Sequence, residues 1–80
     1  MTSIKAIIVD DEPSARTLLR KFIEEHCKGV EIVDEAENIK AAVKLINKHK
    51  VELVFLDIEM PEENGFALFD YFDQPSFETI

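Results

Sequence analysis

Apolar residues along the chain alternate between the patterns of strands and of helices. The runs Ile4 to Val9 and Val51 to Leu56 are almost continuously apolar, which is typical of strands covered on both faces in a parallel sheet. Charges interrupt the run from Val30 to Ala36, as is common in an edge strand. The pattern therefore predicts two central strands and one edge strand.

Between these runs, apolar positions recur with the spacing of helices. From Ser14 to Lys28 they fall at i, i+3, i+4, i+7 and i+8 and predict one buried helical face, made of Ala15, Leu18, Leu19, Phe22 and Ile23. Pro13 suits the first helical turn, and Gly29 is placed to end the helix in a left-handed conformation. A second helix is predicted from the N-cap Asn38 to about His49.

The order of these elements defines the fold class. Strands that alternate with helices predict an α/β fold, with a parallel sheet and right-handed crossovers. Phe66 to Phe72 predict a third, short helix, and Phe77 to Ile80 predict the opening of a fourth strand. The 80 residues allow one domain with a small core.

Composition narrows the range of partners. The net charge of −8 argues against direct binding of nucleic acid, which needs clustered Lys and Arg. It suits a module that binds a metal cation or a basic surface, although solubility alone would also explain it. No apolar run is long enough to span a membrane, and the single cysteine, Cys27, makes a reducing cytoplasm the default location.

Carboxylates follow two of the predicted strands. Asp10 and Asp11 come after the first strand, and Asp57 ends the third. If these strands are neighbours, three carboxylates converge at the edge of the sheet where open α/β folds place their chemistry. Such a group of hard oxygen ligands suits Mg²⁺, although Asp10 and Asp11 alone could simply be acids at a helix N-terminus.

Three motifs together carry a specific resemblance. They are the segment from Ile7 to Pro13, the segment from Leu53 to Pro61, and Asn64-Gly65-Phe66. In residue types and spacing, over nearly the whole chain, they resemble the receiver domain of bacterial two-component response regulators, most closely the LytR/AlgR class. The resemblance implies the flavodoxin-like (CheY-like) fold, with strand order 2-1-3-4-5.

The resemblance also implies a phosphotransfer site. Asp57 matches the phosphoacceptor, which receives a phosphoryl group from a partner histidine kinase. Asp11 matches the direct Mg²⁺ ligand, Asp10 holds the ion partly through water, and the backbone carbonyl of Glu59 matches the third protein ligand. Pro61 and Gly65 match the loop beside the site.

The chain departs from the family pattern at its C-terminal end. It contains about three strand–helix units plus a stub of the fourth strand, so residues 1–80 are interpreted as a truncated receiver domain without an output domain. The Ser or Thr of the family's fourth strand and the Lys of its fifth strand have no counterpart. We therefore expect Mg²⁺ binding to survive, phosphorylation to be poor and switching to be lost.

Three other hypotheses stay open. An interaction module of receiver type, without phosphotransfer, would keep the fold and leave the acids unused. A phosphatase with an Asp nucleophile is disfavoured, because the run from Asp10 to Ser14 lacks the Asp-x-Asp-x-Thr pattern. The truncation exposes the third strand, and the tail from Phe77 to Ile80 could cover that strand or be exchanged with a second copy. The chain is therefore expected to form a homodimer through the third strand and this tail.

Overall fold

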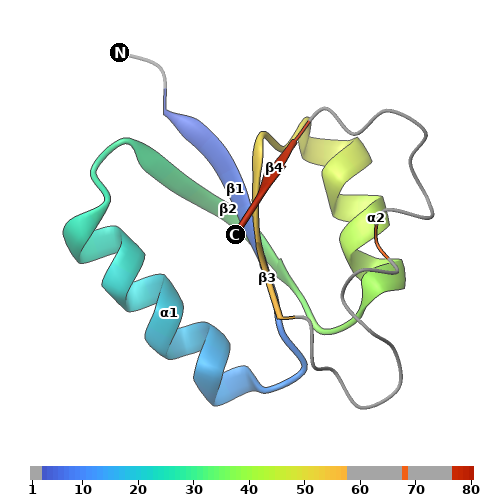
Figure 1. The fold of residues 1–80 in the computed structure, drawn as a ribbon, viewed down its shortest axis with the longest axis horizontal. Coiled ribbons are helices and arrows are strands. Elements are labelled where there is room, and N and C mark those ends of the chain that lie inside the picture. Colours follow the sequence, from blue (N-terminus) through green and yellow to red (C-terminus); the bar gives the residue numbers. More distant parts are fainter. Residues whose placement is uncertain (1–2, 58–67, 69–76) are drawn as a thin grey trace.

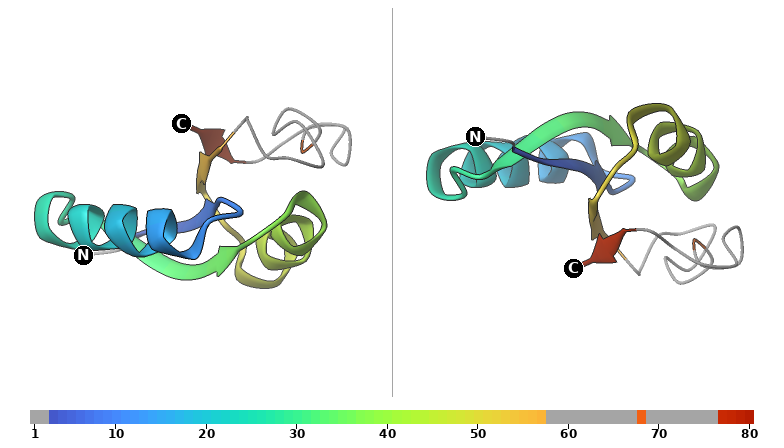
Figure 2. Two further views of the ribbon diagram at one scale, coloured as in Figure 1. Left: turned by 90° about the horizontal axis from the view of Figure 1, so that it is seen from below. Right: turned by 90° about the horizontal axis from the view of Figure 1, so that it is seen from above.

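The computed structural model describes residues 3–57, 68 and 77–80. Four parallel strands form one sheet in the order β2-β1-β3-β4, with α1 and α2 on its opposite faces (Figures 1 and 2). The α/β architecture predicted from the sequence is therefore confirmed. The elements are β1 (Ile4–Val9), α1 (Pro13–His26), β2 (Val30–Ala36), α2 (Ile39–His49), β3 (Leu53–Leu56) and β4 (Glu78–Thr79).

The central strand β1 supplies side chains to both halves of the core. Because side chains alternate along a strand, Ile7 and Val9 join the cluster on the α2 face, whereas Ala6 and Ile8 join the cluster on the α1 face. All four are almost completely buried. This double burial explains why the run was apolar without alternation.

Strand β3 is shorter than the apolar run that predicted it. Val51 is buried in the core but precedes the strand. The outer edge of β3 is paired with β4 of the same molecule, with Leu56 N–H donating to the Ile80 carbonyl at 2.9 Å and Ile80 N–H donating to the Val54 carbonyl at 2.9 Å. The tail thus covers its own third strand, and an exchanged homodimer stays a prediction.

Strand β2 lies at the other edge, as predicted, and contains a bulge. The register with β1 changes between Ala6, which faces Ile32, and Ile7, which faces Asp34, so that Val33 is an extra residue. Val33 packs with the α2-face cluster and Asp34 Oδ2 lies 3.7 Å from Nε2 of the α2 residue His49. The bulge therefore directs two successive side chains to one face and returns Glu35 to the α1 face.

Two predictions about α1 were wrong. The expected buried stripe is only partly covered, because Ile23 is buried but Leu18 and Phe22 are 71% and 57% exposed. The helix ends at His26, with Cys27 as C-cap, and Gly29 does not take a positive φ. The left-handed residue is instead Lys50, which caps α2 with φ 53° and ψ 54°.

The predicted third helix, Phe66 to Phe72, lies outside the described residues except for Leu68, which is completely buried in the α2-face cluster. The N-cap predicted for α2 is confirmed, because the Asn38 side chain accepts a hydrogen bond from Ala41 N–H at 2.8 Å. Neither described helix has the length and apolar character needed to cross a membrane.

Candidate functional site

The pairing of β1 with β3 brings the predicted acids together. The last pair in the register is Val9 with Leu56, so Asp10 and Asp57 follow at adjacent positions on the sheet edge. Asp57 N–H donates to the Val9 carbonyl at 3.0 Å, and Asp10 N–H donates to the Ala36 carbonyl at 3.0 Å. The backbone of each aspartate is thus held by the neighbouring strand.

Asp11 completes the cluster. One carboxylate oxygen from each of Asp10, Asp11 and Asp57 lies within 4.8 Å of the others, and all three residues are partly exposed. The three are the group that sequence analysis selected. Carboxylate oxygens at this spacing fit a small, hard cation such as Mg²⁺, which is bound by one or two carboxylates and keeps several waters.

The turn between β1 and α1 fixes the orientation of Asp10. Its Oδ1 accepts a hydrogen bond from Glu12 N–H at 3.0 Å. The Glu12 carbonyl in turn accepts the first α1 hydrogen bond, from Arg16 N–H at 3.1 Å, and Pro13 occupies the first turn. The Asp10 carboxylate therefore lies against the turn that starts the helix.

A pocket of about 400 Å³ opens beside Asp10 and Asp57 on the α1 face of the sheet. Its walls are mainly apolar, with Leu19 from α1, Phe55 from β3 and Ile80 from the chain end. Asp10 and Asp57 therefore lie at the polar end of an apolar hollow, where both remain partly exposed to solvent.

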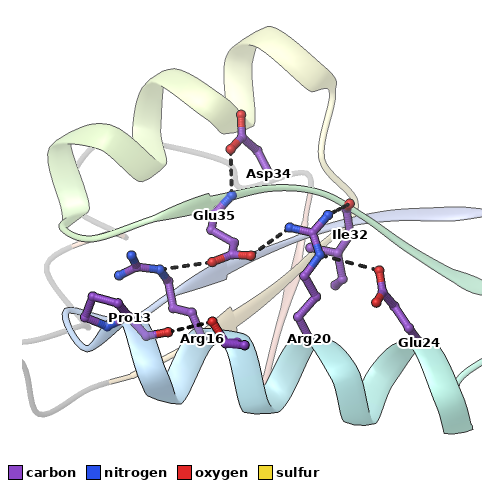
Figure 3. A network of polar contacts seen from close by, with 8 residues as sticks. Pro13, Arg16, Arg20, Glu24, Ile32, Asp34 and Glu35 are labelled. Carbon is purple, nitrogen blue, oxygen red and sulfur yellow. Dashed lines mark hydrogen bonds and ion pairs between the residues drawn. The ribbon is translucent and has the colours of Figure 1, made fainter.

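Sequence analysis missed a polar network between α1 and β2 (Figure 3), which one further hydrogen bond connects to this site. Arg16 Nε donates to Glu35 Oε1 at 3.1 Å, and Arg20 Nη1 donates to Glu35 Oε2 at 2.7 Å. Arg16 Nη1 also donates to the backbone carbonyl of Asp10 at 2.6 Å. The apolar face predicted for this helix leaves both arginines on its other side, and nothing in the spacing of charges marks Glu35 as their partner.

Arg20 anchors the far end of this network. The hydrogen bond with Glu35 raises the pKa of Arg20 above its ordinary value, with a further contribution from Glu24. Arg20 Nη2 also donates to the Ile32 carbonyl at 3.3 Å. Arg20 thus holds Glu35 through a charged guanidinium, as arginine does at any physiological pH.

The other predicted site residues cannot be placed. Glu59, Pro61 and Gly65 lie outside the described residues.

The sequence of this chain is similar to that of a known protein family and of individual known proteins. The model of the response regulator receiver domain matches residues 6–79. The sensory transduction protein LytT of Bacillus anthracis is 42% identical over 65 residues, which cover 81% of this chain and 26% of LytT. The chain thus spans about a quarter of the length of that relative.

The fold of this chain is also similar to the folds of solved structures. The receiver domain of AraT, a response regulator from Geobacillus stearothermophilus, matches with a TM-score of 0.76 and 34% identity, covering 88% of this chain and 54% of that one. A chain of the CheX–CheY–BeF3–Mg²⁺ complex from Borrelia burgdorferi matches with a TM-score of 0.73 and 25% identity, covering 88% of this chain and 55% of that one.

Proposed function

This chain belongs to the response regulator receiver domain family, and we propose that its Asp57 accepts a phosphoryl group from a histidine kinase with the help of Mg²⁺. The observation that supports the proposal best is the cluster of Asp10, Asp11 and Asp57, whose oxygens lie within 4.8 Å of one another. The Mg²⁺ in the related Borrelia complex adds support for the choice of cation.

In this proposal all three acids bind the metal, and Asp57 is also the nucleophile. Asp11, Asp10 and Asp57 would hold the ion, which supplies positive charge that offsets the repulsion between two anionic reactants. A carboxylate oxygen of Asp57 attacks the phosphorus of a phosphohistidine. The new P–O bond forms an acyl phosphate as the P–N bond breaks, and the histidine nitrogen leaves with the electron pair and takes up a proton.

The site geometry supports Asp57 as the nucleophile. Its backbone is held against β1 by the hydrogen bond to the Val9 carbonyl, and its side chain is partly exposed beside the pocket. A nucleophile at the end of a rigid strand keeps a fixed direction toward an incoming phosphoryl group, which lowers the entropic cost of the reaction. Receiver domains of this type are signalling modules, and we propose no turnover of external substrates.

Intact-mass spectrometry with a small phosphodonor, acetyl phosphate, tests the proposal. In Mg²⁺ we expect the chain to gain one phosphoryl group in low yield, and we expect EDTA to prevent the gain. Asp57→Asn should not be labelled. The matched control is Glu31→Gln, which also neutralises a carboxylate on the sheet but lies outside the cluster, and it should be labelled like the wild type.

Two outcomes would refute the assignment. A mass gain that persists in Asp57→Asn would place the phosphoryl group elsewhere. No mass gain under any condition would favour the alternative, an interaction module of receiver type without phosphotransfer. Hydrolysis of p-nitrophenyl phosphate that depends on Asp57 would instead revive the phosphatase hypothesis.

A further inference from the structure

In the network between α1 and β2, Glu35 pairs with Arg16 and Arg20 (Figure 3). A further hydrogen bond, from Arg16 to the Asp10 carbonyl, connects this network to the turn that carries two of the three acids. We propose that Arg16 is a positioning residue for the metal site, and that Glu35 orients it. Arg16 acts through the Asp10 carbonyl rather than on the ion. This inference rests on the proposed function, because it concerns Mg²⁺ binding by the same three carboxylates.

The rigid guanidinium of Arg16 bonds to two parts of the fold, the strand β2 and the turn between β1 and α1. Nε donates to Glu35 Oε1 on β2 at 3.1 Å, and Nη1 donates to the Asp10 carbonyl at 2.6 Å. The side chains of Arg16 and Glu35 are only 16% and 24% exposed, so water competes little for these hydrogen bonds. A planar guanidinium holds its donors in a fixed fork, and an ammonium group cannot reproduce that geometry.

Glu35 is itself held in place. Its second oxygen, Oε2, accepts from Arg20 Nη1 at 2.7 Å, and its backbone N–H donates to Asp34 Oδ1 at 2.8 Å. The β2 bulge at Val33 turns Glu35 toward α1, so the irregularity in the strand supplies the acceptor that Arg16 needs. Bulges commonly redirect a side chain beside a functional site.

With Arg16 in place, Asp10 is fixed at three atoms. Its N–H donates to Ala36, its carbonyl accepts from Arg16, and its Oδ1 accepts from Glu12 N–H. Three carboxylates so close together repel one another and would tend to spread apart in the absence of a cation. A turn that resists spreading keeps the ligands near the metal-bound arrangement and lowers the ordering cost of binding.

The charge of Arg16 and its positioning of Asp10 predict opposite changes in Mg²⁺ affinity when Arg16 is replaced. Arg16 is a cation near an anionic site, so its charge alone disfavours a second cation there. If only charge mattered, Arg16→Met would bind Mg²⁺ more tightly than the wild type. If positioning dominates, Arg16→Met binds Mg²⁺ more weakly, as happens when groups that orient metal ligands are removed.

The test is a Mg²⁺ titration by isothermal calorimetry, at a temperature where circular dichroism shows each variant to be folded. We expect Arg16→Met to raise the dissociation constant about tenfold. The matched control is Arg20→Met, which also removes one arginine from α1 and one ion pair with Glu35. None of the Arg20 hydrogen bonds among the described residues is to Asp10. Arg20 reaches the turn only through Glu35, so we expect a much smaller loss of Mg²⁺ affinity in this variant than in Arg16→Met.

Arg16→Lys is the second variant, for use if Arg16→Met does not fold. It keeps the charge and loses the fork, so we expect it to bind Mg²⁺ more weakly than the wild type. Equal or tighter binding in the Arg16 variants would overturn the inference, as would an equal loss in Arg20→Met. Wild-type protein that binds no Mg²⁺ would instead overturn the proposed function, and the inference with it.

Discussion

Asp11→Asn should make the metal-free protein more stable and the metal-loaded protein less stable than the wild type. The substitution keeps the size of the side chain and removes one of three charges whose oxygens lie within 4.8 Å of one another. It therefore removes two repulsive pairs, one with Asp10 and one with Asp57. Because the unfolded chain separates these residues, the relief of repulsion stabilises the folded state.

The size of the effect follows from Coulomb's law. Two unit charges about 4.8 Å apart in the dielectric of water repel by about 0.9 kcal/mol, and a Debye length of about 10 Å at 0.1 M salt reduces this to about 0.5 kcal/mol. Two such pairs give about 1 kcal/mol for these partly exposed groups. In a domain of this size, that gain raises Tm by about 4–8 °C.

When Mg²⁺ is bound, the wild type should become more stable than Asp11→Asn. A ligand that binds only the folded state at about 100 times its dissociation constant stabilises that state by about 2.7 kcal/mol. Wild-type protein gains this stability, whereas Asp11→Asn has lost a ligand and gains little. The two stabilities should therefore become equal when the Mg²⁺ concentration is about four times the wild-type dissociation constant.

Thermal melting followed by circular dichroism, in EDTA and across a Mg²⁺ series at constant ionic strength, measures both halves of this prediction. Glu31→Gln is the control, because it also neutralises an acid but lies on β2, outside the cluster. Its Tm should change little in either condition. A lower Tm for Asp11→Asn in EDTA, or an equal gain from Mg²⁺ in both proteins, would refute the reasoning.

Two further predictions concern the backbone conformations of Lys50 and Gly29. Lys50 takes a left-handed conformation at the end of α2, so Lys50→Gly should raise the free energy of unfolding by about 1 kcal/mol; a loss of stability in urea titrations would contradict this. Gly29 has no positive φ, and an added Cβ would meet nothing within 4 Å. Gly29→Ala should therefore stabilise by about 0.4–1 kcal/mol, and destabilisation would show that Gly29 needs its conformational freedom.

The proximity of the acids was predictable because it depends only on strand order and parallel direction. Two apolar runs that end in carboxylates must bring those carboxylates together once the strands are paired in parallel. The register between β1 and β3 then places Asp10 beside Asp57. No side-chain detail is needed for this step. The alternation of strands and helices predicted the parallel direction, and the resemblance to receiver domains implied the strand order.

The sequence did not predict how much of the apolar face of α1 is buried. Periodicity shows which residues share a helical face, but it does not show how wide a surface lies beneath that face. In the structure, Ile23 contacts the sheet while Leu18 and Phe22, on the same stripe, stay largely exposed. The apolar face of α1 is therefore larger than the area that the sheet buries.

The polar network could not be predicted because it depends on a single irregularity. Strict alternation from Ile32, on the α1 face, would direct Glu35 toward α2, away from Arg16 and Arg20. The extra residue Val33 reverses this direction, and the charges within β2 fit either register equally well. The hydrogen bond from Arg16 to Asp10 thus follows from a backbone feature that leaves no mark in the pattern of apolar and polar residues.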